Sequence, residues 1–128
     1  GVIDSQDAII GNPTYDLVSL VDDVRIKTSK KLKKKIYEYY LKRTSKLYRI
    51  HSDKFSHDFN VLSIQRNMKI IGIFSRLFKR DKKKKYMKLI PYTWKLLDMR
   101  MEPKFFSELK NILDKHIPPR LRKNILLK

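Results

Sequence analysis

Residues 53–79 of the chain read DKFSHDFNVLSIQRNMKIIGIFSRLFK. Apolar side chains recur in this stretch every three or four residues, which is the period of an α-helix. They form two stripes, one with Phe55, Phe59, Leu62, Ile70, Ile73, Phe74 and Leu77 and another with Val61, Ile64, Met68, Ile71 and Phe78. A helix that is apolar on two sides is usually enclosed by other helices. The pattern therefore predicts a mainly helical protein built around this segment, with close backbone packing at Gly72.

Apolar periodicity predicts further helices on both sides of this segment, at residues 14–25, 29–48, 84–100 and 103–117. The apolar side of the 29–48 helix is expected to contain Leu32, Ile36, Tyr39, Tyr40, Arg43 and Leu47, with lysines opposite. Pro91 is expected to kink the 84–100 helix or to divide it into two shorter pieces. We expect residues 1–120 to form one unit and residues 121–128 to form a loose basic tail.

The composition excludes several classes of protein. The 128 residues include no cysteine, so disulfide scaffolds, thiolate metal sites and cysteine nucleophiles are excluded. No apolar run approaches the roughly 18 residues that a membrane-spanning helix needs, so we expect no membrane partner. No signal peptide is visible either, and a cytoplasmic protein is therefore expected.

The charge is strongly positive, because 31 Lys and Arg residues face 13 Asp and Glu residues, which gives a net charge of +18. Such a surface attracts phosphate-rich partners. An AT-rich genome or an acidic segment elsewhere would explain the same excess without any binding role. One hypothesis is therefore a small basic helical module that binds nucleic acid or another anionic surface, although the sequence holds no recognised nucleic-acid-binding motif.

The first residues, Gly1-Val2-Ile3-Asp4, are typical of the end of a short buried strand. A lone strand cannot satisfy its backbone hydrogen bonds, and no second strand is predicted elsewhere. Together with the initial glycine, this strand predicts that the chain is the C-terminal piece of a longer protein.

Asp4 and Asp7 lie three residues apart directly after this strand. Carboxylates in such a position hold Mg²⁺ against substrate phosphates in many folds, because this ion prefers oxygen ligands and keeps some of its waters. The same spacing is also common in ordinary turns and helix caps. The pair alone therefore leaves both interpretations open.

A wider stretch, residues 3–20, reads IDSQDAIIGNPTYDLVSL. It resembles the segment that follows the catalytic loop in the aminoglycoside phosphotransferase-like kinases, which reads approximately I-D-[FW]-x-D-A-x-x-G-x-P-x-x-D-L-A. Ser5 stands where that family has an aromatic residue. Residues 65–74, QRNMKIIGIF, are similar to a bacterial subgroup that phosphorylates N-acetylmuramate and N-acetylglucosamine, amino sugars of the cell wall, at the anomeric hydroxyl. Residues 86–94 and 116–119 fit the same subgroup.

The resemblance implies a helical part of the C-lobe of a protein-kinase-like fold, with a short strand at its start. It also implies ATP- and Mg²⁺-dependent phosphoryl transfer to a sugar hydroxyl, with Asp4 as a metal ligand and Asp7 as a weaker candidate. By the same resemblance, Asp16 supports the catalytic loop from behind. The general base and the nucleotide lobe are expected upstream, so the isolated chain should be inactive and should need that lobe as its partner.

Three consecutive polar residues, Gln65, Arg66 and Asn67, interrupt the apolar central helix. They either line a sugar pocket or pair with buried partners such as Asp22 or Asp23. Trp94 and Tyr92 have a similar pair of interpretations, since each aromatic ring either stacks on a sugar or packs in the core. All of these residues are candidates for substrate binding.

Overall fold

The computed structural model describes residues 11–47 and 49–123 of the chain, which form helices and contain no strand. The α-helices are α1 (Thr14–Val21), α2 (Lys30–Thr44), α3 (Ser52–Asp81), α4 (Ile90–Arg100), α5 (Ser107–His116) and α6 (Pro119–Lys123), with two 3₁₀ helices, η2 (Lys84–Leu89) and η3 (Lys104–Phe106). The predicted mainly helical fold is confirmed. The strand expected at Gly1–Asp4 lies outside the described residues.

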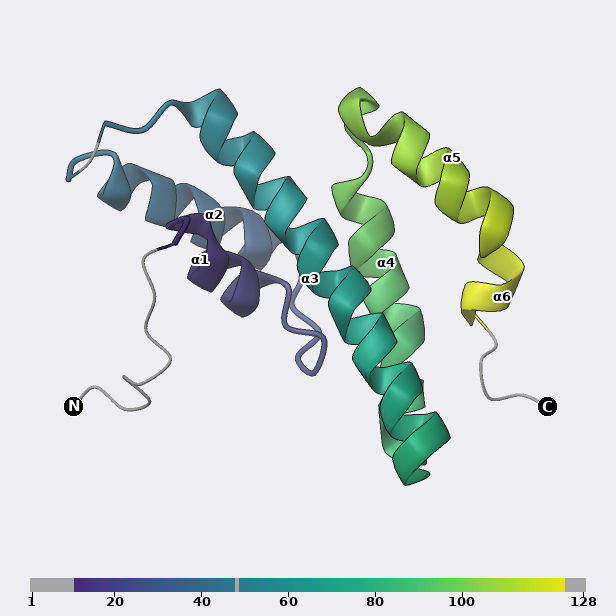
Figure 1. The fold of residues 1–128 in the computed structure, drawn as a ribbon. Coiled ribbons are helices and arrows are strands. Elements are labelled where there is room, and N and C mark those ends of the chain that lie inside the picture. The colour runs from purple at the N-terminus through teal and green to yellow at the C-terminus, as the bar shows by residue number, and fades with distance from the viewer. Residues whose placement is uncertain (1–10, 48, 124–128) are drawn as a thin grey trace, which may run out of the picture.

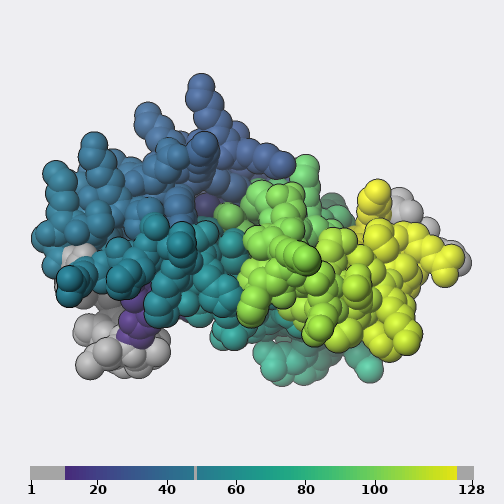
Figure 2. All heavy atoms as spheres, turned by 90° about the horizontal axis from the view of Figure 1, so that it is seen from above, coloured from purple at the N-terminus to yellow at the C-terminus, as the bar shows by residue number. Residues whose placement is uncertain are grey.

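The long helix α3 lies in the middle of the molecule, between the other helices. In Figure 1, α1 and α2 lie on one side of α3, while α4, α5 and α6 lie on the other. Figure 2, seen from above, places the blue α2 and the yellow α5–α6 segment at opposite ends. The two apolar stripes predicted for α3 do not each face their own set of helices. Phe55, Phe59 and Leu62 pack on the α1–α2 side, whereas the rest of that stripe and most of the other stripe pack on the α4 side.

The apolar interior consists of two clusters that meet along α3. The first cluster contains Leu17, Val18 and Val21 of α1 with Phe55 and Phe59 of α3. Rings from α2 pack against it; Tyr37, for example, meets Phe59 edge to face, with 5.0 Å between ring centroids. The second, larger cluster joins α3 to α4, η2 and η3; its buried members are Val24, Ile64, Phe74, Met87, Ile90, Trp94, Leu96, Leu97, Met101 and Phe106.

Local signals explain where the helices begin. Ser29 accepts a hydrogen bond from the Leu32 backbone N–H at 3.2 Å, so it caps α2. Pro91 lies in the first turn of α4, where its missing N–H costs nothing. The expected 84–100 helix is accordingly divided into η2 and α4, which confirms one of the two outcomes predicted for Pro91.

The apolar side expected for α2 is partly wrong. Leu32, Tyr39, Arg43 and Leu47 are exposed, whereas Ile36 and Tyr40 pack inward as predicted. The inward face also carries Lys33, Tyr37, Leu41 and Thr44, which were not predicted there. The helix is rotated relative to the prediction because the Lys33 ammonium has a carboxylate partner in the interior, as described below.

Two other expectations also differ from the structure. Gly72 is exposed, and a Cβ atom at this position would meet nothing within 4 Å, so no close backbone packing occurs there. The loose tail expected from residue 121 is wrong for residues 121–123, because α6 continues the fold to Lys123 and its Arg122 is buried. The Arg122 guanidinium binds Asp98 and Asp114 at 2.9 and 2.6 Å, and these ion pairs order the helix.

Candidate functional site

A fully buried carboxylate, that of Asp22, lies at the point where α1 ends. The Asp22 backbone N–H donates to the carbonyl of Val18 at 2.9 Å, which is the last hydrogen bond of the helix. The chain then turns away through Asp23 toward α2. Because burial of an unpaired carboxylate is very unfavourable, the surroundings of Asp22 must supply compensating charge.

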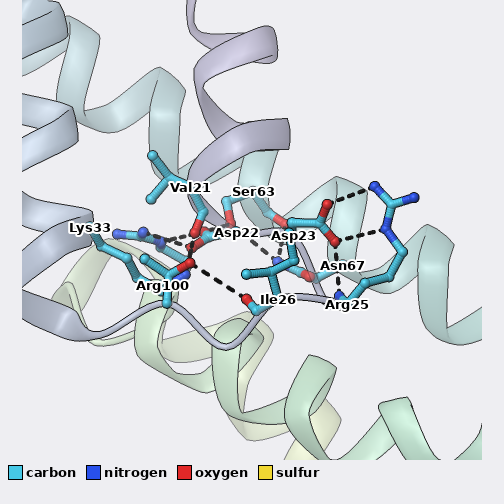
Figure 3. Close-up of polar contacts among 10 residues, drawn as sticks. Val21, Asp22, Asp23, Arg25, Ile26, Lys33, Ser63, Asn67 and Arg100 are labelled. Carbon is cyan, nitrogen blue, oxygen red and sulfur yellow. Dashed lines mark hydrogen bonds and ion pairs between the residues drawn. The ribbon is translucent and has the colours of Figure 1, made fainter.

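Three other helices supply that compensation. Arg100 of α4 donates to both carboxylate oxygens of Asp22, through Nε at 2.8 Å and a terminal nitrogen at 3.0 Å. Lys33 of α2 lies 3.0 Å from Oδ1, and Ser63 of α3 donates its hydroxyl to Oδ2 at 2.6 Å. Figure 3 shows these side chains converging on Asp22 from their separate helices. We call Asp22, Lys33, Ser63 and Arg100 the Asp22 cluster.

The electrostatics of the cluster favour the ionised carboxylate. Burial alone would raise the pKa of the Asp22 carboxyl, but hydrogen bonds from Arg100 and Ser63 and the charges of Arg100 and Lys33 outweigh it. The pKa of Asp22 is therefore held below its ordinary value. Two cations surround one anion, so the cluster retains one excess positive charge.

Asn67 extends the cluster along α3. Its side-chain amide donates to the Ser63 carbonyl at 2.9 Å and to the Ser63 hydroxyl at 3.2 Å, which orients that hydroxyl toward Asp22. Its own oxygen, Oδ1, is buried without a hydrogen-bond partner among the described residues. On the opposite side of the cluster, the Lys33 ammonium also donates to the carbonyl of Val21.

Two cavities adjoin the cluster. The larger has a volume of about 900 Å³ and lies between the residues leading into α2, helix α4 and Lys110 of α5. The smaller has a volume of about 360 Å³ and includes Arg100 in its wall. Lys30, Lys33, Met99 and Glu102 line both, so the cavities are neighbours and Lys33 of the Asp22 cluster lies in the wall of each.

Comparison with known proteins gives matches to one kind of enzyme. The chain is 32% identical over 123 residues, 96% of its length, to the N-acetylmuramate/N-acetylglucosamine kinase of Caulobacter vibrioides. It is 37% identical over 94 residues, 71% of its length, to the protein of the same name from Neisseria meningitidis serogroup B. A third protein of that name, from Pseudomonas putida, is 30% identical over 94 residues, also 71% of the chain.

The chain is homologous to these kinases. The matched regions are 33% of the Caulobacter protein and 28% of each of the other two, so the chain spans about a third of the length of the curated relatives it matches. No family model and no solved structure matches the chain.

The residues expected to act directly on phosphate in such kinases, Asp4 and Asp7, lie outside the described residues. Asp16 is exposed in the first turn of α1, where the positive end of the helix dipole favours a carboxylate. Within residues 11–47 and 49–123, no group of three or more histidine, aspartate or glutamate side chains is placed to hold a metal ion. No helix in the same residues is long and apolar enough to cross a membrane.

Four of the five predicted sugar contacts line neither cavity. Gln65 is exposed, and Arg66 donates to the Ser19 hydroxyl at 3.1 Å on the α1 side of α3. Asn67 belongs to the buried extension of the Asp22 cluster. Trp94 is buried in the second apolar cluster, with the Arg122 guanidinium 4.4 Å above its ring. Tyr92, the fifth candidate, lines the larger cavity.

Sequence reasoning missed Lys33 and Arg100 as members of the site. Lys33 stands in a run of lysines, and nothing in the sequence separates it from its exposed neighbours. Arg100 is 78 residues from Asp22, so only the folded chain shows the pairing. Asp22 was predicted only as a possible partner of Gln65, Arg66 or Asn67, whereas Arg66 binds Ser19 and Asn67 binds Ser63.

Proposed function

We propose that this chain forms a helical part of an ATP- and Mg²⁺-dependent kinase that phosphorylates N-acetylmuramate or N-acetylglucosamine on a hydroxyl. The observation that carries the proposal is the match of 96% of the chain, at 32% identity, to a protein of that name. The reaction needs ATP, so a cytoplasmic location is part of the proposal, as is a role in recycling cell-wall amino sugars.

The residues have distinct roles in this proposal. Asp4 holds Mg²⁺ on the ATP phosphates, with Asp7 as an additional contact, because phosphoryl transfer depends mainly on positioning and on neutralising the charge of the transferred group. Asp16 stabilises the start of α1 and orders the neighbouring catalytic loop. The nucleotide lobe and the general base come from sequence outside this chain.

The polar and aromatic candidates differ in their roles on the sugar side of the reaction. Gln65 and Arg66 line neither cavity, so no direct contact with the acceptor is proposed for them. Asn67 and Trp94 are buried, so their proposed role is to hold the wall of the site from behind. Asn67 does so by fixing Ser63, which in turn binds Asp22.

The test is an activity assay on the protein expressed from the complete reading frame that carries this chain. ³¹P NMR would follow phosphate transfer from ATP to N-acetylmuramate and to N-acetylglucosamine. The expected result is a sugar phosphate that disappears when Mg²⁺ is chelated. The methyl glycoside of N-acetylglucosamine, whose anomeric hydroxyl is blocked, is the matched control. Absence of transfer to either free sugar would contradict the proposed function.

A further inference from the structure

The larger cavity has a wall with two chemically different parts. Pro91, Tyr92, Leu96 and Met99 of α4 give an apolar side, which includes the half-buried ring of Tyr92. Aromatic and aliphatic side chains of this kind pack against the C–H face of a ring-shaped ligand. The volume of about 900 Å³ is in the range of small-molecule sites.

The other part of the wall is cationic. Five lysines line the cavity, but two of them are already paired, since Lys33 binds Asp22 and Lys110 binds Asp114 at 3.0 Å. The remaining three, Lys27, Lys30 and Lys95, form no ion pair with any carboxylate in the part of the chain that the structure describes.

The acidic groups of the cavity do not neutralise these lysines. Asp98 is bound by Arg122 at 2.9 Å, which leaves Glu102 as the one unpaired carboxylate of the wall among the described residues. Three cations therefore face one anion at the rim. The Asp22 cluster beneath them adds its own excess positive charge, and its Lys33 is more than nine-tenths buried. A charge excess in a partly enclosed wall attracts an anion more strongly than the same charge does on open surface.

We propose that this cavity binds a carboxylate-bearing amino sugar, with Lys30 and Lys95 binding the carboxylate and Tyr92 packing against the sugar ring. This inference rests on the proposed function and adds a basis for specificity to it. N-Acetylmuramate carries a lactyl carboxylate that N-acetylglucosamine lacks, so the two lysines distinguish one acceptor from the other. Lys33 is a positioning residue, because its charge is fixed by Asp22, whose geometry depends on Ser63 and Asn67.

The experiment measures binding of three probes by calorimetry: N-acetylmuramate, N-acetylglucosamine and inorganic phosphate. It uses the protein from the complete reading frame, without ATP. N-Acetylmuramate should bind about tenfold more tightly than N-acetylglucosamine, since two exposed charge contacts each contribute up to about 1 kcal/mol. The Lys30→Met/Lys95→Met double variant should lose most of that preference while its affinity for N-acetylglucosamine is unchanged. Salt at about 0.5 M should reduce the preference in the parent protein.

Lys35→Met is the matched control, because Lys35 is exposed on the same helix as Lys30 and lines neither cavity. It should keep the preference for N-acetylmuramate. Equal affinity for the two sugars, or a preference that survives in the double variant, would overturn the inference. Lysine-dependent binding of phosphate but not of N-acetylmuramate would overturn it as well.

The same variants separate this inference from the proposed function. If the double variant raises the KM for N-acetylmuramate alone, both are supported. If the protein transfers phosphate but its KM values do not respond to the lysines, only the inference is wrong. If carboxylate-dependent binding occurs without any phosphate transfer, the proposed function is wrong and the binding site stands.

Discussion

The guanidinium of Arg100 binds the carboxylate of Asp22 through two hydrogen bonds of 2.8 and 3.0 Å, although the residues are 78 positions apart in the chain. Lys33 binds the same carboxylate from α2, and Ser63 binds it from α3. The fully buried side chain of Asp22 therefore links α1, α2, α3 and α4 through its polar contacts. This relationship leads to two predictions about stability.

Replacement of Asp22 by asparagine is expected to destabilise the fold by about 3 kcal/mol or more, because it leaves Lys33 and Arg100 buried without a counter-charge. Chemical denaturation of parent and variant measures the change. Glu38→Gln is the matched control, since Glu38 forms an exposed pair with Lys34 at 3.7 Å and should change stability by no more than about 0.5 kcal/mol. Equal effects of the two substitutions would show that the Asp22 pairing contributes no special stability.

The Asp22 cluster also predicts a pH dependence. The pKa of Asp22 is lower in the folded state than its ordinary value of 3.8, so its contribution to stability is fully present above that value. The contribution is lost as the pH falls through the folded-state pKa. The stability difference between the parent and Asp22→Asn should therefore shrink as the pH falls below about 4. Denaturation midpoints of both proteins between neutral and acidic pH check this, and a difference independent of pH would refute it.

Arg122 is expected to be the residue that holds α6 in place. It binds Asp98, Asp114 and the carbonyl of Ile117, and its guanidinium lies over the Trp94 ring. Arg122→Lys keeps the positive charge but loses the planar guanidinium, which binds two carboxylates at once. The substitution should therefore lower the free energy of unfolding by about 2 kcal/mol.

The single tryptophan of the chain is a convenient reporter, because its fluorescence should change when the guanidinium is removed from its ring. Limited proteolysis should cut the Arg122→Lys variant near α6 more rapidly than the parent. Arg120→Met is the control, as Arg120 is exposed on the same short helix. A variant as resistant to proteolysis as the parent would show that other contacts hold α6.

Lys82 ends α3 in the left-handed conformation, with φ 54° and ψ 23°. Glycine adopts this conformation without the steric cost that a Cβ atom brings, so Lys82→Gly should stabilise the protein by about 0.5–1 kcal/mol. Ser45, which ends α2, has a right-handed conformation with φ −65°, and Ser45→Gly should instead destabilise. Thermal melting of the two variants tests the opposite signs. A loss of stability in Lys82→Gly would contradict the argument.

The proposed chemistry predicts a separation between two aspartates. In the complete kinase, Asp4→Asn should leave the melting temperature almost unchanged and lower turnover by about a hundredfold or more, because the metal ligand loses its charge. Asp16→Asn should instead lower stability and activity together. Initial rates and melting curves on both variants provide the measurement. Turnover near the parent rate in Asp4→Asn would show that Asp4 is not the metal ligand.

Periodicity predicted the helices well, since apolar spacing and proline positions act locally. The broad extent of α3, the break at Pro91 and the start of α2 at Ser29 all follow from such signals. The inward position of Lys33 could not be predicted, because a lysine is buried only when a distant carboxylate compensates it. The expectation for Gly72 failed for a related reason: helix packing, and not the glycine alone, decides whether backbones approach each other.

The candidate site was predictable only in part. Asp22 was identified as a possible buried partner, but its real partners come from three helices whose packing no local pattern encodes. The tail expected from residue 121 was also wrong at its start because contacts between distant residues cannot be read from a local pattern. Arg122 in a basic segment is typical of a solvated tail, whereas its buried contacts with Asp98 and Asp114 exist only after α4 and α5 have packed.

The shared helix α3 has a consequence for the order of folding. Each apolar cluster is assembled mainly from helices that are near one another in sequence. Its contacts can therefore form early in folding, because only short segments of chain must be brought together. The Asp22–Arg100 pair instead spans 78 residues and needs both halves of the molecule to be in place. We therefore expect this pair to form after the rate-limiting step, so that substitutions at Arg100 accelerate unfolding and leave the folding rate nearly unchanged.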